Sequence, residues 1–396
     1  MTKSLTIIGS GIIGSAIAYE LSCVLNDQII VIEKDSTLYG DKQSTRNSGV
    51  FHAGIYYDAR LTPLKANLCV KGNQLAYQFC DEFGVSYAKT GKIVVVSKKR
   101  QLPYLEDLLR ISKENGVEHQ TLTPDDIKKH EPNVSGIAGA YFPSSGIVEP
   151  VQYLKTLQRL SKSNGVIFLP GNKVIKIQPK GSVFDIVVEL NGKYESFESN
   201  RVINAGGLYS DTIAKMVNPD FAYELLPLKA EAVCFNISRE NINTRHNVYP
   251  VPHGFFLNGK SADIEFDEFY KLYENKKIKK TTGVHLTPTL EKQKRNFTLG
   301  NIITVGPLIS RTGIKDDYNP EVPIDSFHER IKKFFPHIKR SDLVPYQVGI
   351  LAKLKDHEDF LIQPDNKYEN FINLVGIDSP GLTSSLAIAK YVKNMI

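Results

Sequence analysis

Three glycines near the start of the chain have the spacing of a phosphate-binding turn. The segment Gly9-Ser10-Gly11-Ile12-Ile13-Gly14 follows the apolar, strand-like run 5–8 and precedes a helix-type segment over 15–21. Glycine at these places allows a tight turn, a close approach of the backbone to a pyrophosphate, and close packing of the helix on the strand. The N–H groups at the start of the helix then face the phosphates.

An acidic residue completes this pattern. A second apolar run, 28–32, ends at Glu33, about 20 residues beyond Gly14. A carboxylate at this distance accepts hydrogen bonds from ribose hydroxyls and disfavours a 2′-phosphate, and therefore NADP. The spacing predicts a dinucleotide site whose residues are Gly9, Gly11, Ile12, Ile13, Gly14, Glu33 and Lys34.

A polar stretch and a glycine pair follow where a cofactor would extend. Hydroxyl, guanidinium and amide groups suit a second phosphate or the edge of an isoalloxazine ring, although an ordinary solvated loop has the same composition; the residues are Ser44, Thr45, Arg46, Asn47, Ser48 and Gly49. The buried strand expected over 201–204 ends at Ala205, Gly206 and Gly207, which permit close approach to a ligand or form a plain strand-to-helix turn. No second G-x-G-x-x-G occurs, which excludes reductases that need two dinucleotide sites.

The composition indicates a globular protein of two or three domains. The chain has 396 residues, 41% of them hydrophobic, and a formal net charge of +6, which does not argue for nucleic-acid binding. Four cysteines without C-x-x-C pairs indicate neither a disulfide framework nor a zinc site, so we expect no metal and a reducing, cytoplasmic compartment. The apolar run 5–21 is interrupted by glycines and serines, so a signal peptide is the weaker interpretation.

Several further motifs resemble one enzyme family. They are 46–57 (RNSGVFHAGIYY), 64–69, 90–96, 145–148 and, near the carboxyl end, 376–385 (GIDSPGLTSS). Together they are similar to the L-2-hydroxyglutarate oxidase/dehydrogenase branch of the D-amino-acid oxidase superfamily. The resemblance extends over almost the whole chain, and its 46–57 and 379–383 motifs are specific.

The resemblance implies an α/β fold with a Rossmann-like FAD domain and an antiparallel substrate domain. The FAD domain would be assembled from residues 1–85, 148–215 and 341–396, and the substrate domain from 86–147 and 216–340. It also implies FAD contacts by Val174, Ser379, Gly381, Leu382 and Thr383. The start of the helix expected over 384–391 would stabilise negative charge on a reduced flavin through its dipole, or would be a plain N-cap.

The implied activity is oxidation of a small 2-hydroxy acid, with L-2-hydroxyglutarate, giving 2-oxoglutarate, as the leading candidate. Hydride would pass to flavin N5, and the electrons would leave to oxygen, a quinone or a protein acceptor. Oxidation of sn-glycerol 3-phosphate or of amino acids and amines on the same scaffold stays open. A flavin-containing protein that binds nucleic acid or another partner is a further alternative.

Histidine is the natural base for such a reaction. His285, in an apolar strand-like segment, is the first candidate, and we expect it to titrate in the imidazole range; a histidine satisfied within a sheet is the alternative. His52, after the polar stretch, is the second, and it can instead contact FAD, since some relatives attach FAD covalently through a histidine. For the substrate we expect Lys353, where the family's G-I-R-x-K segment has Leu351 in place of its arginine, with Tyr249, Arg60, Arg311 and Tyr57 as further candidates.

About thirty residues, approximately 254–282, separate two motifs that a short turn usually joins in the family. The window 271–295 has eight basic and two acidic residues. We expect a solvated, extended excursion, with contact to a membrane surface or an acidic partner as the alternative.

Overall fold

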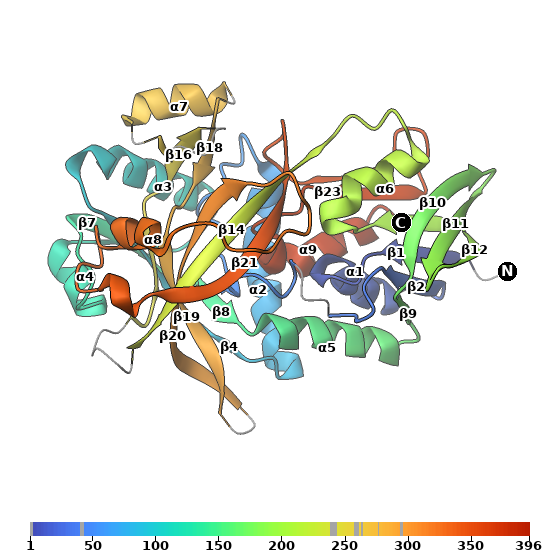
Figure 1. Cartoon of the computed structure of the whole chain (residues 1–396), viewed down its shortest axis with the longest axis horizontal. Helices are drawn as coiled ribbons and strands as arrows, with labels where there is room; N and C mark the ends of the chain where they lie inside the picture. The colour runs from blue at the N-terminus through green and yellow to red at the C-terminus, as the bar shows by residue number, and fades with distance from the viewer. Residues whose placement is uncertain are drawn as a thin grey trace.

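The polypeptide forms a parallel sheet at one end of the molecule and a larger, mostly antiparallel sheet at the other (Figure 1). This arrangement confirms the α/β class expected from the sequence. The computed structural model describes residues 3–39, 43–237, 244–256, 261–262, 264–275, 277–293 and 296–396.

The parallel sheet contains the two runs that the sequence predicts as its first strands. Its order is β22 (Leu361–Pro364), β23 (Phe371–Val375), β13 (Arg201–Asn204), β1 (Ser4–Ile8), β2 (Gln28–Glu33) and β9 (Ile167–Pro170). All neighbours run parallel except β22 and β23. The strands β1 and β23 are apolar over most of their length because sheets of this kind are covered on both faces.

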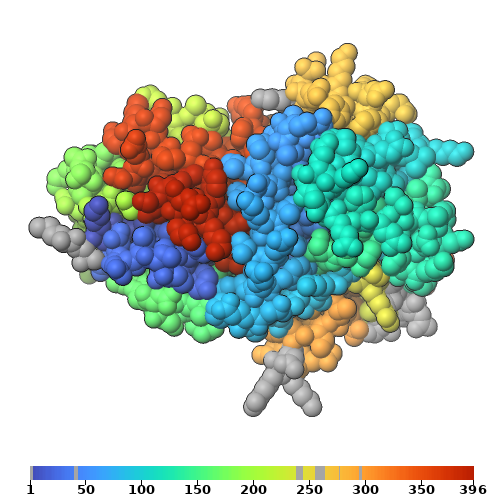
Figure 2. Space-filling view, turned by 180° about the vertical axis from the view of Figure 1, so that it is seen from behind, coloured from blue at the N-terminus to red at the C-terminus, as the bar shows by residue number. Residues whose placement is uncertain are grey.

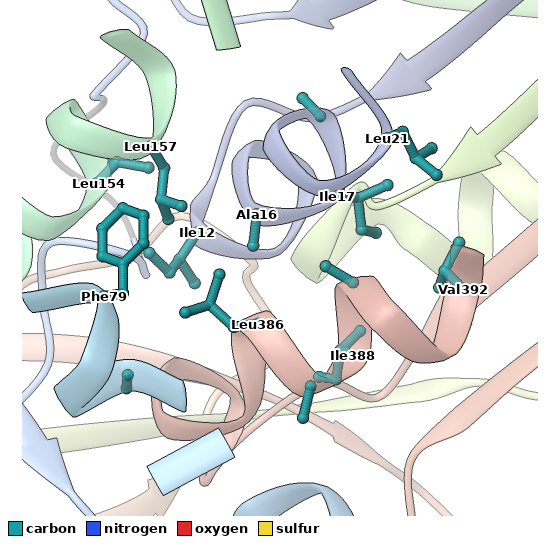
Figure 3. Close-up of a cluster of buried hydrophobic side chains, with 14 of the residues drawn as sticks. Ile12, Ala16, Ile17, Leu21, Phe79, Leu154, Leu157, Leu386, Ile388 and Val392 are labelled. Carbon is teal, nitrogen blue, oxygen red and sulfur yellow. The ribbon is translucent and has the colours of Figure 1, made fainter. Parts of the chain in front are cut away.

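The helices beside this sheet form its main core. They are α1 (Ile12–Ser22), α2 (Pro63–Phe83), α5 (Pro150–Ser163) and α9 (Gly381–Lys393), with α6 (Ser210–Val217) against β10. Figure 3 shows Ile12 and Ala16 of α1 close to Leu386 of α9 and Leu157 of α5. Seen from behind, α9 and α1 lie next to α2, so the two ends of the chain are packed together (Figure 2).

The larger sheet has eight strands. In order they are β21 (Val344–Leu354), β14 (Leu225–Asn236), β20 (Asn296–Arg311), β19 (His285–Gln293), β15 (Asn247–Pro250), β5 (Lys92–Val96), β7 (Ala138–Phe142) and β6 (Gln120–Leu122). The helices α3 (Leu102–Glu114), α4 (Pro124–His130) and α8 (Ile324–Ile331) pack around it. Our domain boundaries stay a prediction with one correction: β21, which we placed with the FAD segment 341–396, pairs with β14 along its length and belongs to this sheet.

Three smaller sheets complete the framework among the described residues. One contains β10 (Lys173–Lys180), β11 (Val183–Leu190) and β12 (Lys193–Ser199), and another β3 (Val50–Phe51), β8 (Gly146–Val148) and β4 (Tyr87–Ala88). The third contains β17 (Ser261–Ala262), β16 (His253–Phe256) and β18 (Ile278–Thr281). The dipeptide Asn191-Gly192 joins β11 and β12 in a tight hairpin turn, with φ of 52° and 76°. The strands β9 and β10 follow one another in the chain but belong to different sheets.

Gly14→Ala should lower the free energy of unfolding by about 1–3 kcal/mol, the usual cost of overpacking. A Cβ at this position would lie 1.9 Å from the backbone oxygen of Gly9. Thermal denaturation of the variant checks this, with Gly313→Ala as control because a Cβ at Gly313 meets open space. Equal melting temperatures for both variants and the unsubstituted protein would contradict the close packing of α1 on the turn.

Candidate active site

A cavity of about 800 Å³ lies where the carboxyl ends of the parallel strands meet the eight-stranded sheet. Residues after β1, β2 and β13 line one part of it, and residues of β14, β19, β20 and β21 line another. In open α/β sheets, ligands bind at this edge of the strands.

The predicted phosphate turn has the geometry that a pyrophosphate needs. Gly9 has φ of +105°, and a Cβ there would lie 2.5 Å from the backbone oxygen of Ala205. The helix α1 begins after Gly11 without a capping side chain and without an acidic residue in its first turn. Its Ile12 N–H donates to Ser44 Oγ at 2.8 Å, so the polar stretch contacts the helix start. An anion therefore fits at this helix end.

Glu33 lies at the end of β2 and lines the cavity beside Lys34. Its carboxylate accepts from the N–H and Oγ of Ser10, at 2.9 and 3.0 Å, which fixes it next to the turn. Its contact with a ribose stays a prediction.

Most of the other expected cofactor residues also line this cavity: Gly9, Gly11, Ile12, Ile13, Ser44, Arg46, Asn47, Ser48, His52, Val174, Ala205, Gly206, Gly207, Ser379, Gly381, Leu382 and Thr383. Three expected residues, Thr45, Gly14 and Gly49, do not line the cavity. Gly14 is packed against Gly9, and a Cβ at Gly49 would meet the backbone of Val148. The polar stretch 44–49 is held along the cavity by hydrogen bonds such as the one that Asn47 Nδ2 donates to the carbonyl oxygen of Ser44, at 2.9 Å.

The carboxyl-terminal motif contacts the region of His52. The helix α9 begins at Gly381 with no side-chain cap. The Thr383 hydroxyl accepts from His52 N at 3.0 Å and donates to Val50 O at 3.2 Å. His52 Nε2 lies 3.4 Å from Ser379 Oγ. The two specific motifs of the sequence therefore form one wall of the cavity.

His285 is held in one tautomer at the start of β19. Its Nδ1 donates to the carbonyl of Gly283 at 2.9 Å, so Nε2 is the acceptor nitrogen. The ring stacks on Tyr249 with 3.7 Å between centroids, and the residue is 5% exposed. Burial lowers the pKa of His285 to about 3, so our expectation of titration in the imidazole range is wrong. The ring is a neutral base at physiological pH.

Lys92 is a buried cation that the sequence reasoning missed. It is fully buried on β5, with Nζ 3.9 Å from the centroid of the Tyr249 ring and 3.5 Å from His52 Nδ1. Burial lowers the pKa of Lys92 to about 7. The pKa of His52 is also lowered, first by the burial of its own ring and then by the positive charge of Lys92. A lysine within the apolar run 92–96 was the available signal.

Lys353 lines the cavity within a cluster of paired charges. Its Nζ lies 3.3 Å from Glu358 and 3.7 Å from Asp378, which in turn pairs with Lys65 at 2.7 Å. Burial alone would lower the pKa of Lys353, but the two carboxylates raise it above its usual range. Tyr57 and Tyr249 also line the cavity.

The two arginines expected to bind the substrate, Arg60 and Arg311, are not among the residues that line the cavity. Arg60 pairs with Asp58 at 2.5 Å, and its side chain is 60% exposed. Arg311 is exposed at the end of β20. Local pairing and strand position therefore exclude both from the site as the structure has it.

The segment expected as an extended excursion is folded, so that expectation is wrong. It forms β16 (His253–Phe256), β17 (Ser261–Ala262), α7 (Phe266–Glu274) and β18 (Ile278–Thr281). Phe269 of α7 packs on Tyr104 of α3, and the helix lies on the outer surface near α3 (Figure 2). Lys271 and Lys277 are exposed, Lys279 is buried, Lys280 lines the cavity, and Lys276 lies outside the described residues.

The described ranges contain no group of three or more His, Cys, Asp or Glu side chains that could bind a metal ion. None of their helices is long and apolar enough to cross a membrane.

Comparison with solved structures shows the fold. The L-α-glycerophosphate oxidase of Mycoplasma pneumoniae, solved with FAD bound, superposes with a TM-score of 0.82 at 23% identity, covering 100% of this chain and 94% of that one. Glycine oxidase from Geobacillus kaustophilus gives 0.75 at 17% identity, covering 100% and 95%.

Comparison of sequences identifies relatives along the whole chain. L-2-hydroxyglutarate dehydrogenase of Indibacter alkaliphilus is 29% identical, over 98% of this chain and 97% of its own length. The enzyme of the same name from Escherichia coli K12 is 26% identical, over 98% and 92%. The family model "FAD dependent oxidoreductase" matches residues 4–395. The chain therefore belongs to this family of FAD-dependent oxidoreductases and uses FAD as its cofactor.

Proposed function

We propose that the protein oxidises a small 2-hydroxy acid, with L-2-hydroxyglutarate, giving 2-oxoglutarate, as the leading substrate. The observation that supports this most is a neutral imidazole, His285, which lines a cavity that buried lysines also line. The relatives named L-2-hydroxyglutarate dehydrogenase add support.

Each side chain of the cavity has its own role in the proposed reaction. Bound FAD supplies the acceptor for the hydride that leaves Cα. His285 Nε2 takes the hydroxyl proton, while the carbonyl of Gly283 fixes the tautomer. The ammonium groups of Lys353 and Lys65 attract a substrate carboxylate, and Asp378 and Glu358 position them. Tyr249 stacks on the base and limits its rotation.

Two other substrate classes are kept as alternatives. A glycerol phosphate or an amine can occupy the same scaffold, as the names of the structural neighbours indicate. Apart from Arg46, the cationic residues that line the cavity are lysines, which favours carboxylate over bidentate phosphate recognition. The electron acceptor (oxygen, a quinone or a protein) and the cellular compartment stay open.

Anaerobic mixing of the FAD-loaded protein with a substrate panel tests the proposal. L-2-hydroxyglutarate should bleach the flavin, whereas sn-glycerol 3-phosphate and amino acids should not. Bleaching by one of the latter, with none by any 2-hydroxy acid, would contradict the proposal.

His285→Ala should slow reduction of the flavin by substrate about 10²- to 10⁴-fold, the usual loss for a positioned base. Reoxidation should hardly change, because it does not need this proton transfer. Stopped-flow absorbance measures both steps, with His52→Ala in parallel. Near-normal reduction in His285→Ala and a large loss in His52→Ala would assign the base to His52.

Substrate should bind more weakly as the pH rises through about 7, because Lys92 then loses its proton. Unit charges roughly 10 Å apart interact by about 1.7 kcal/mol at an effective dielectric constant of about 20, which is more than tenfold in Kd. Lys92→Met should remove this pH dependence, as measured by the Kd from flavin reduction between pH 6 and 8. A midpoint that persists in the variant would assign the effect to another group.

A further inference from the structure

The folded insertion brings two consecutive lysines, Lys279 and Lys280, to the cavity. Side chains of consecutive strand residues point to opposite faces. On β18, Lys279 is 2% exposed and forms an ion pair with Glu358, which lines the cavity. Lys280 also lines the cavity, but its ammonium group contacts the backbone of Tyr56 instead. The pair between Lys279 and Glu358 joins the insertion to the segment that also contacts Lys353.

Lys280 has no carboxylate partner in the described part of the chain. Its Nζ donates to the backbone oxygen of Tyr56 at 3.4 Å. The carboxylates that act on the pKa of Lys280, those of Asp58 and Asp107, both pair with Arg110, at 3.0 and 2.6 Å. Burial lowers the pKa of Lys280. An ammonium in such a place is stabilised by an anionic ligand.

The charges in the cluster around Asp378 and Glu358 do not balance. Lys65, Lys279 and Lys353 share these two carboxylates, which leaves one positive charge. Lys280 adds a second, apart from Lys92, which faces the rings of Tyr56 and Tyr249. These charges belong to two separate groups, because Lys65 and Lys353 meet at Asp378 while Lys280 contacts the Tyr56 backbone. Two separated cations match two separated anionic groups better than one compact dianion.

The Tyr56 side chain offers a further donor to the cavity. Its hydroxyl is buried and has no hydrogen-bond partner among the described residues, and the residue lines the cavity. Its ring stacks on Tyr249, which stacks on His285. The Tyr56 ring is therefore connected to the base through Tyr249, while its backbone oxygen contacts Lys280.

We infer that Lys280 binds the second carboxylate of a dicarboxylate hydroxy acid, with the Tyr56 hydroxyl as an additional donor. The insertion is then a specificity element, which selects a dicarboxylate over a monocarboxylate. This inference rests on the proposed function, because it takes the oxidation of a 2-hydroxy acid as given. It concerns only how the second carboxylate of the substrate is bound.

Binding of non-oxidisable analogues tests it. Calorimetric titration of the FAD-loaded protein compares glutarate with its monoamide, glutaramate, which has the same shape but one charge. Lys280→Met should raise the Kd for glutarate about ten- to hundredfold, which corresponds to the loss of a charged hydrogen bond, and leave the Kd for glutaramate nearly unchanged. Lys277→Met, an exposed position of the same segment, should change neither.

Three results would overturn the inference: no change in glutarate binding, an equal loss for both ligands, or a larger loss for sn-glycerol 3-phosphate than for glutarate. Flavin content and melting temperature report whether the variant folds, and Lys280→Arg, which keeps the charge, should retain preference for glutarate. Selective glutarate binding in a protein whose flavin no hydroxy acid reduces would reject the proposed function and leave the role of Lys280 standing.

Discussion

Buried positive charge is the constraint on which the substrate end of this molecule depends. Removing an ammonium from water is costly unless it is paired and hydrogen-bonded. The structure meets this cost for Lys65 and Lys353 with carboxylates, and for Lys92 with the faces of two tyrosine rings. What is left is a positive cavity with a neutral base, which suits an anionic substrate that must lose a proton.

This charge arrangement explains why distant segments meet here. Asp378 comes from the turn before α9, Glu358 follows β21, and the insertion supplies Lys279. The same insertion ends just before Gly283, whose φ of +65° turns the chain into β19 and whose carbonyl accepts from His285. Recognition and the tautomer of the base therefore depend on one short connection between two sheets.

The nucleotide end could be predicted from the sequence because its signal is local: the glycines, the flanking apolar runs and Glu33 lie within one βαβ unit. The pKa of His285 and the burial of Lys92 depend on packing between strands distant in sequence, which periodicity does not show. The folded insertion did have a local signal. Aromatic residues recur at helical spacing over α7, at Phe266, Phe269, Tyr270 and Tyr273. The number of lysines in this window indicates a solvated excursion instead, which is why the helix was missed.

The pH dependence of the limiting rate of flavin reduction tests the central claim, that His285 acts as a base kept neutral by burial. At saturating substrate, changes in affinity do not contribute, so the rate reports the proton-transfer step. The account predicts a rate that is constant between pH 5 and pH 7, because the pKa of His285 is about 3. A rate that falls as the pH drops through 6 to 7, with this fall absent in His285→Ala, would contradict it.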